Sequence, residues 1–340
     1  MATVEAIFSD GERFTFDARA DETVLAAARR HGLALASDCE TGECQTCVGT
    51  IKSGAIDYED GVDISLSDAD VAAGLALCCV ATPRDNLVIE LPYTRASLLP
   101  VRTAYLSVTA VEPLCKSAVA LRGKLMRNAK LDFYAGQYVN LTVPGTTHQR
   151  AYSMANPPEE PDALEFLVRL IDGGAMSEFL RAALQSGPAP GTVFALKGPY
   201  GVFYRREREA PMLMIAGGTG LAPMLAMLRQ LVQRGASRRR ITLCFGVTAA
   251  DDLFGLDVLD RLAETLPGLE RRVAIMRPDA SWSGTRGVAT DLLTPADLEG
   301  APDAYLCGPP PMIAAARAWL AAHGQPPARI FAEEFTPTGT

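Results

Sequence analysis

Three cysteines that lie close together constrain this chain more than any other feature. Cys39, Cys44 and Cys47 have the spacing C-x4-C-x2-C, and an adjacent pair, Cys78 and Cys79, follows. Thiolates with this spacing hold a [2Fe–2S] cluster when a fourth cysteine arrives from a distant turn. The loop therefore predicts an iron–sulfur site.

Two simpler interpretations of the same cysteines are a zinc site and buried structural thiols. Zinc sites favour two C-x2-C pairs or mixed Cys/His sets, and the sequence has one such pair. Gly42 favours the cluster, because a residue without a Cβ atom lets the backbone bend toward the inorganic sulfurs. The N-terminus lacks a basic region followed by an apolar one, so eight cysteines indicate a metal in a reducing, cytoplasmic compartment, not disulfides.

Length and composition predict a soluble multidomain protein. A chain of 340 residues has room for two or three domains, and its 48% hydrophobic and 21% charged residues are ordinary for globular proteins. No apolar run approaches the ~18 residues that cross a bilayer, so we expect no membrane association.

Negative charge is concentrated in the first 95 residues. They carry 7 Lys and Arg against 17 Asp and Glu, a net charge of −10, whereas the whole chain carries −8. Acidic surfaces commonly serve solubility, but this one also predicts electrostatic steering toward a basic protein partner. The sign disfavours nucleic acid as a partner.

The sequence pattern divides the chain into three domains, at 1–95, 101–205 and 210–340. In the first, a hairpin at 4–8 and 13–16, a helix capped by Asp21, the cysteine loop and a strand at 87–91 suit a β-grasp domain. In the second, short strands broken by Gly, Pro and Asn predict an antiparallel β-barrel. In the third, strands alternate with helices, which predicts a doubly wound parallel sheet. The expected fold class is multidomain, α+β and α/β.

Two motifs in the barrel segment have the chemistry to hold a flavin nucleotide. In the run R-A-Y-S at 150–153, the Arg suits a pyrophosphate, the Tyr a flat ring and the Ser a ring nitrogen. Gly173 to Ser177 precedes a helix, and backbone N–H groups at a helix start bind phosphate. Taken alone, the first motif also fits an exposed strand, and the second an ordinary loop with a capping serine.

Two motifs in the third segment follow predicted strands, at the ends where parallel sheets bind ligands. Gly217-Gly218-Thr219-Gly220 joins a strand to a helix, so its backbone can approach a dinucleotide pyrophosphate. Cys307 ends a later strand, where it is either a structural thiol or a neighbour of a nicotinamide.

Together these motifs resemble the ferredoxin–NADP reductase superfamily with a fused N-terminal ferredoxin, over essentially the whole chain. Their order is similar to that of the NADH-dependent reductases of two-component ring-hydroxylating dioxygenases, of the benzoate or anthranilate dioxygenase type. The resemblance implies an oxidoreductase that passes electrons from NADH through FAD and a [2Fe–2S] cluster to a separate Rieske-type oxygenase. FAD is needed because NADH gives a hydride while the cluster accepts one electron at a time. The oxygenase would dock at the acidic ferredoxin domain.

The resemblance also assigns roles to residues. FAD would be held by Arg150, Tyr152, Ser153, Gly174, Met176 and Ser177. NADH would be held by Gly217, Gly218, Thr219, Gly220, Pro223, Cys307, Gly308 and Pro309. The hydride-transfer position would be surrounded by Ser153, Cys307, Glu333 and Phe335, of which Phe335 would cover the flavin ring until nicotinamide displaces it. The cluster would be held by Cys39, Cys44, Cys47 and Cys79.

The fourth cluster ligand is a choice between two neighbours. We expected Cys78 and Cys79 to lie on a strand and therefore to point to opposite sides. The run G-L-A-L-C-C-V-A at 74–81 resembles the ferredoxin pattern that places the ligand at Cys79. Cys78 would then be a buried thiol.

Nucleotide preference is predicted from the acidic pair Asp251 and Asp252, which follows the strand at 241–247. A carboxylate near the ribose accepts hydrogen bonds from the 2′-hydroxyl and repels a 2′-phosphate, which favours NADH. Arg271 or Arg286 would restore NADPH binding if either lay nearby.

Two other functions remain open at the level of sequence. The same module can serve a di-iron monooxygenase or a sugar-deoxygenating enzyme. Alternatively, the chain is a non-catalytic iron–sulfur or zinc protein whose flavin motifs are vestigial.

Overall fold

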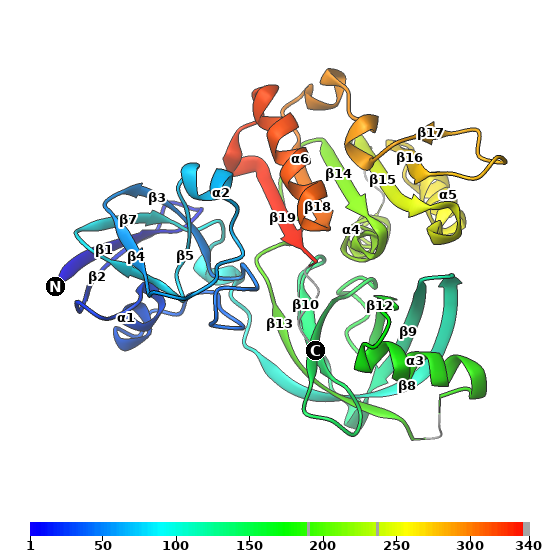
Figure 1. The fold of residues 1–340 in the computed structure, drawn as a ribbon, viewed down its shortest axis with the longest axis horizontal. Coiled ribbons are helices and arrows are strands. Elements are labelled where there is room, and N and C mark those ends of the chain that lie inside the picture. The colour runs from blue at the N-terminus through cyan, green and yellow to red at the C-terminus, as the bar shows by residue number, and fades with distance from the viewer. Residues whose placement is uncertain (189–190, 236–237, 336–340) are drawn as a thin grey trace. The chain divides into compact units, whose positions relative to one another are not determined.

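The computed structural model describes residues 1–188, 191–235 and 238–335, which form two compact units (Figure 1). The first unit consists of residues 1–100 and 200–202, and the second contains the rest of the described chain. Within the described residues, no helix is both long enough and apolar enough to cross a membrane.

The first unit is built on a five-stranded sheet in the order β2-β1-β7-β3-β5. Its strands are β1 (Ala2–Ile7), β2 (Arg13–Ala18), β3 (Val48–Ser53), β5 (Leu75–Leu77) and β7 (Leu87–Glu90). A two-stranded sheet of β4 (Ile56–Tyr58) and β6 (Ala81–Pro83) and two helices, α1 (Val24–Arg30) and α2 (Asp68–Ala72), complete it, with a short turn η1 (Arg95–Ser97). The first and last strands, β1 and β7, pair in parallel at the centre, as the predicted β-grasp fold requires.

The helix start in this unit differs from our prediction. Thr23, not Asp21, is the N-cap of α1, and its hydroxyl accepts a hydrogen bond from the Ala26 N–H at 3.2 Å. A cap must directly precede the first helical residue, and Asp21 lies two positions too early. The helix buries Val24, Leu25, Ala27 and Ala28 against the sheet.

The second unit begins with the predicted antiparallel barrel, a six-stranded sheet in the order β11-β10-β13-β8-β9-β12. Its strands are β8 (Arg102–Cys115), β9 (Ala118–Leu125), β10 (Tyr138–Thr142), β11 (Gln149–Ser153), β12 (Ala163–Arg169) and β13 (Val193–Tyr200), with η2 (Met126–Asn128) and α3 (Ala175–Ser186) between them. An isolated bridge from Met154 to Phe166 joins the two edge strands, β11 and β12, and closes the sheet.

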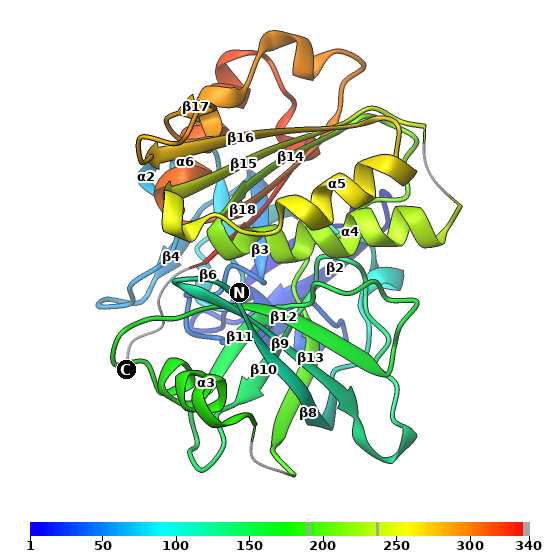
Figure 2. The same ribbon diagram turned by 90° about the vertical axis from the view of Figure 1, so that its right-hand side faces the viewer.

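The second unit continues as a six-stranded parallel sheet in the order β17-β16-β15-β14-β18-β19. Its strands are β14 (Met212–Gly217), β15 (Ile241–Ala249), β16 (Leu269–Arg277), β17 (Thr285–Arg286), β18 (Asp303–Gly308) and β19 (Ile330–Glu334). Its helices are α4 (Leu221–Gln233), α5 (Leu256–Thr265) and α6 (Pro310–Ala322), with short turns η3 (Gly218–Gly220), η4 (Ala250–Asp252), η5 (Ala289–Leu292), η6 (Pro295–Leu298) and η7 (Pro327–Arg329). The predicted alternation of strands and helices is broken around Asp291, where the chain forms the short turn η5 and no α-helix. Figure 2 shows α4 and α5 together along one face of the sheet.

The strand order reverses between β14 and β18, which makes this the topological switch point. Open parallel sheets bind ligands outside the carboxyl ends of the strands at such a point. The barrel shares its apolar core with this region, because Ala135, Leu167 and Phe203 pack in one cluster with the residues of α4. Helix α4 is therefore buried on most of its circumference, between sheet and barrel.

Candidate cofactor sites

The cysteine loop in the first unit is shaped by residues in the left-handed region of backbone space. Glu40, Gly42 and Gln45 all have positive φ values, between 55° and 86°. This conformation turns successive backbone N–H groups inward, and those of Thr41 and Cys44 both donate to Cys39 Sγ at 3.4 Å. A side chain at Gly42 would press on the Asp63 carbonyl oxygen at 3.2 Å.

The four cysteines assigned to the cluster lie in two pairs. The Cys44 thiol donates a hydrogen bond to Cys39, and the Cys47 thiol donates one to Cys79. Cys79 also accepts a hydrogen bond from the Gly42 N–H, so it belongs to the loop. Two pairs of thiolates suit a cluster with two irons, each of which takes two cysteines.

A mononuclear metal site is not supported by the same residues. Within residues 1–188, 191–235 and 238–335, no three His, Cys, Asp or Glu side chains converge where a single ion could bind. An all-cysteine donor set arranged in two pairs is the set that a [2Fe–2S] cluster takes.

Cys78 and Cys79 lie in a turn after β5, not on a strand as we expected. They still differ in surroundings. The Cys78 backbone bonds to the Cys47 carbonyl and the Leu25 N–H, and its thiol is buried. Only Cys79 shares a side-chain hydrogen bond with the described cysteine loop.

A polar contact joins the barrel to the parallel sheet at the switch point. Ser153, the last residue of β11, donates from Oγ to Glu333 Oε2 at 2.7 Å. Glu333 lies directly across from Cys307 in the β18–β19 register. Three of the residues expected at the hydride-transfer position are thus neighbours, although they are far apart in the sequence.

Burial controls the ionisation of this group. Burial raises the pKa of Glu333 to about 8, although the hydrogen bond from Ser153 lowers it. Burial likewise raises the pKa of the Cys307 thiol, and the nearby Glu333 carboxylate adds to the effect. Both shifts favour the protonated, uncharged form of the side chain.

The glycine turn packs directly on the end of β18. A Cβ atom at Gly220 would collide with the Cys307 carbonyl oxygen, and one at Gly217 would lie 2.9 Å from Pro309 Cδ. Thr219 is buried in the turn, and Pro223 is buried in the first turn of α4. Without Cβ atoms, Gly217 and Gly220 let the turn pack directly on the end of β18.

Phe335 follows β19 and returns to the same place. Its N–H donates to the Gly308 carbonyl oxygen at 2.9 Å, and its ring packs against the apolar cluster of this unit. The remaining residues, 336–340, lie outside the described part of the chain.

The two flavin motifs differ in how their side chains are engaged. Tyr152 is partly buried, which raises its pKa, and it meets Phe166 edge-on at 6.4 Å between ring centroids. The Arg150 guanidinium bonds to the Gln149 carbonyl at 2.8 Å.

At the start of α3, Gly174 is the N-cap and Met176 is buried. Ser177 Oγ accepts the Ile171 N–H at 2.8 Å, which leaves its hydroxyl hydrogen for another acceptor.

The acidic pair after β15 contacts the barrel. Asp251 lies 3.4 Å from Lys116 Nζ, and Asp252 accepts hydrogen bonds from Ser117 Oγ and the Ala249 N–H. Asp252 therefore has a structural role at the turn η4, whereas Asp251 is exposed. The sequence could not reveal Lys116, because 135 positions separate it from Asp251.

The arginines proposed as alternative phosphate partners lie elsewhere. Arg271 is level with Leu243, near the start of β15, and it pairs with Asp260. The acidic pair follows Ala249, which is level with Arg277 on β16. Six residues of strand separate the position of Arg271 from that of the acidic pair, which is about 20 Å along the sheet. Arg286 lies on the edge strand β17, level with Ile275. Arg277 is thus the sheet arginine closest in register to the acidic pair, and our sequence reasoning missed it.

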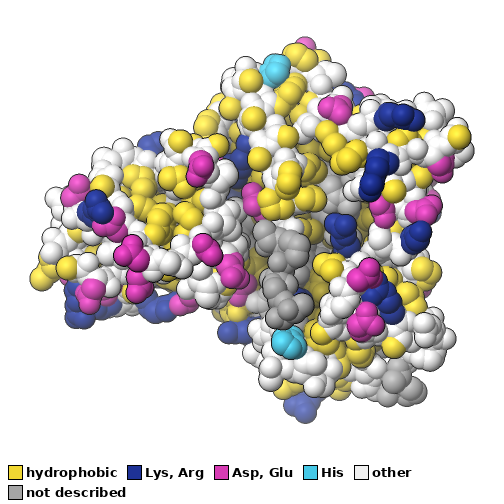
Figure 3. All heavy atoms as spheres, viewed as in Figure 1, with side chains coloured by type: hydrophobic (Ala, Val, Ile, Leu, Met, Phe, Trp, Pro, Cys, Tyr) yellow, Lys and Arg dark blue, Asp and Glu magenta, His cyan; other side chains and the backbone are white. Residues whose placement is uncertain are grey.

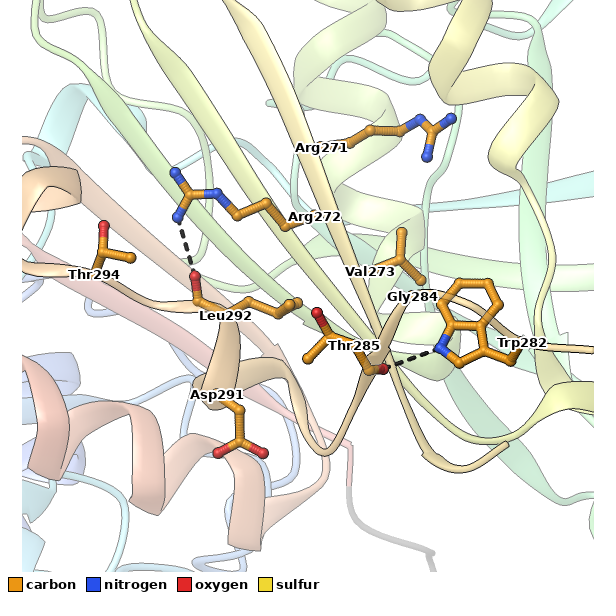
Figure 4. A pocket seen from close by; sticks show the side chains of 9 residues that line it. All are labelled: Arg271, Arg272, Val273, Trp282, Gly284, Thr285, Asp291, Leu292 and Thr294. Atoms are coloured by element: carbon orange, nitrogen blue, oxygen red, sulfur yellow. Dashed lines mark hydrogen bonds between the residues drawn. The ribbon is translucent and has the colours of Figure 1, made fainter. Parts of the chain in front are cut away.

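A pocket of about 490 Å³ lies at the β16–β17 edge of the sheet (Figure 4). In it, Arg272 donates to the Leu292 carbonyl and the Trp282 indole to that of Thr285. Its lining contains none of the residues assigned to a cofactor, so the pocket is separate from the switch point.

Comparisons with known proteins agree with this arrangement. The 2Fe-2S iron-sulfur cluster binding domain family matches residues 7–84, the oxidoreductase FAD-binding domain family matches 105–204, and the oxidoreductase NAD-binding domain family matches 214–318. The 2-halobenzoate 1,2-dioxygenase electron transfer component of Burkholderia cepacia is 36% identical, with 97% of each chain covered. The propane 2-monooxygenase reductase component of Mycolicibacterium goodii is 34% identical, with 94% of each covered. Among solved structures, a cytochrome P450 reductase from Amycolatopsis matches with a TM-score of 0.70 at 31% identity, over 99% of both chains.

The chain therefore belongs to the ferredoxin–NADP reductase superfamily, in the group of electron-transfer components with a fused [2Fe–2S] domain. It is an oxidoreductase with domains for a [2Fe–2S] cluster, FAD and NAD.

We predict different outcomes for serine variants of the two adjacent cysteines. Cys79→Ser should lose most of the iron, sulfide and visible absorption of the purified protein, because it removes one of two paired ligands. Cys78→Ser is the matched control and should keep them. Iron and sulfide analysis checks this, and the reverse pattern would make Cys78 the ligand.

We also predict that Glu333 makes stability depend on pH in a defined window. The folded protein holds a proton at Glu333 up to about pH 8, whereas the unfolded chain releases it near 4.5. The unfolding free energy of the wild type, relative to Glu333→Gln, should therefore fall as pH rises through this window, by up to about 5 kcal/mol. Denaturant unfolding of both proteins from pH 4.5 to about 9 measures the difference. Parallel pH profiles would contradict the assignment.

Proposed function

We propose that this protein passes electrons from NADH, through FAD and a [2Fe–2S] cluster, to the terminal component of an aromatic-ring-hydroxylating dioxygenase. The observation that carries the proposal is that one chain combines the two cysteine pairs with the Ser153–Glu333–Cys307 group at a switch point. FAD supplies the exchange between a two-electron donor and a one-electron acceptor. We retain the domain limits 1–95, 101–205 and 210–340 as part of the proposal.

The residues at the switch point would orient the nucleotide. The Gly217–Gly220 turn offers backbone N–H groups to a pyrophosphate at the start of α4. Cys307 and Glu333 would flank the nicotinamide with side chains whose uncharged forms are favoured, and Ser153 Oγ, which donates to Glu333, would lie beside the flavin ring. Tyr152 would lie on the flavin face, and Phe335 would cover the ring in the absence of nucleotide.

FAD, and not FMN, fits the anion-binding features of the barrel. The N-terminus of α3 with Ser177 and the guanidinium of Arg150 are the groups that we assign to its pyrophosphate. NADH is the proposed nucleotide, because the exposed Asp251 carboxylate would accept hydrogen bonds from a ribose 2′-hydroxyl and repel a 2′-phosphate.

The partner would dock on the acidic rim, which we define as Glu43, Glu59, Asp60, Asp63 and Asp68. These side chains are exposed, and none forms an ion pair with any residue that the structure describes. Ser65 lies between rim residues Asp63 and Asp68 and joins this segment to the cysteine loop. Its N–H donates to the Gly42 carbonyl, and its own carbonyl accepts a hydrogen bond from the Gln45 side chain. Acidic side chains are visible across this unit in Figure 3. A basic oxygenase surface would thus approach the cluster.

A monooxygenase is the second candidate partner. The relatives named as monooxygenase reductases, such as the phenol 2-monooxygenase component of Pseudomonas, are up to 36% identical, as similar as the dioxygenase components.

Reconstitution tests the proposal. With NADH, the protein should support product formation by a benzoate-type oxygenase component, and the rate should fall several-fold as salt rises from about 0.05 to 0.3 M because screening weakens steering. Activity only with a monooxygenase hydroxylase would replace the first candidate by the second.

A pair of charge variants locates the docking surface. Asp63→Asn should slow association with the oxygenase and reduce its salt dependence. Asp10→Asn, an equal change of charge in the β1–β2 turn of the same unit, should have little effect. Equal effects of the two variants would show that only the net charge matters.

A further inference from the structure

We propose that Arg229 is a positioning residue that holds the flavin motif in register with the nucleotide-binding turn. The inference rests on the function proposed above. Arg229 lies on α4, the helix that begins at the Gly217–Gly220 turn, two helical turns after Leu221. Its side chain is about three-quarters buried.

Arg229 binds the barrel at two adjacent acceptors. Nη1 donates to the Ala155 carbonyl oxygen at 2.9 Å and to Glu165 Oε2 at 2.6 Å. Ala155 is the second residue after Ser153, in the run R-A-Y-S-M-A-N that we assign to FAD. Glu165 is on β12, and its other oxygen accepts from Arg122 at 3.1 Å. The contact therefore joins the helix of one cofactor site to the strand of the other.

The acceptor segment is itself fixed in place. The Ala155 N–H donates to the Glu165 carbonyl oxygen at 2.8 Å, and the Glu165 N–H donates to Asn156 Oδ1 at 2.9 Å. Asn156 is buried and also donates to the Ala163 carbonyl at 2.7 Å. A displacement of α4 would thus be passed to the end of β11 through a stiff, hydrogen-bonded segment.

Two links then hold the first and the last of three consecutive residues of the flavin motif. Ser153 is bound to Glu333 on β19, and Ala155 is bound to Arg229 on α4. These two elements follow β18 and β14, the strands on either side of the switch point. One link alone would allow the motif to pivot, whereas two fix both its position and its orientation relative to a nucleotide at the turn. Hydride transfer requires such alignment, and a misplacement of about 1 Å can cost on the order of 100-fold in rate.

The neighbouring Arg234 provides a matched control. It follows the same helix and bridges to the barrel through Glu159 at 2.9 Å, and it also pairs with Glu207. Its barrel partner lies outside the flavin motif. Arg234→Ala therefore removes a brace between the same two parts without touching the segment that ends at Asn156.

The test compares Arg229→Ala, Arg229→Lys and Arg234→Ala in the full-length protein with its cofactors. Arg229→Ala should slow single-turnover flavin reduction by NADH about tenfold or more, while FAD content and the Kd for NADH stay within about threefold. The visible circular dichroism of the bound flavin on addition of NAD⁺ should also change. Arg229→Lys, which retains one donor to the Ala155 carbonyl, should recover part of the rate. Arg234→Ala should lower the melting temperature without changing the flavin reduction rate or the dichroism.

The outcomes separate this inference from the function on which it rests. A wild type that binds neither FAD nor NADH would overturn the proposed function. A normal wild type, with Arg229→Ala unchanged in rate and dichroism or changed only as much as Arg234→Ala, would overturn the positioning role alone. If Arg229→Ala does not fold, Arg229→Lys against Arg234→Ala still decides the question, since loss of rate in the first and not in the second supports the role.

Discussion

The lack of space between the ends of β14 and β18 is the constraint on which the rest of the second unit depends. At Gly220 any side chain would collide with the Cys307 carbonyl oxygen, and Gly217 and Gly308 are in close contact. Two strand ends packed this closely leave their backbone groups at one edge of the sheet, which a dinucleotide can reach. On the other side of β18, the parallel pairing with β19 places Glu333 opposite Cys307.

The barrel meets this edge through polar side chains that are mostly buried. Ser153 contacts Glu333, and Glu165 contacts Arg229, so charged or polar groups from each part are compensated by the other. Around them, α4 and the barrel share one apolar core, and the burial of its side chains stabilises the contact between the two parts. The first unit instead carries the exposed carboxylates of the acidic rim, an arrangement better suited to meeting a partner than to internal stability.

Local patterns in the sequence predicted the elements and the ligand loop, but not the contacts between distant segments. The alternation of apolar and polar residues predicted the β-grasp unit, and the alternation of strands with helices predicted the parallel sheet. These patterns arise within single strands and helices, so they can be seen in the local sequence. The cap of α1 was misplaced by two residues, since Asp21 and Thr23 are both good caps and only the backbone decides. The position of Cys78 and Cys79 in a turn was missed because Leu75–Leu77 continues the apolar run into them. Arg229 and Lys116 had no local signal at all, because their partners are 64 to 135 positions away.

The order of the redox centres is the central claim, and one comparison of electron acceptors tests it most directly. In Cys47→Ser, which removes one of the cysteines that we propose to bind the cluster, NADH should still reduce a two-electron dye at close to the wild-type rate. The same variant should fail to reduce cytochrome c, which accepts single electrons. Retained FAD and a wild-type melting curve would show that the variant is folded. Loss of both activities in such a folded variant, or full retention of cytochrome c reduction, would contradict a path from NADH through FAD to the cluster.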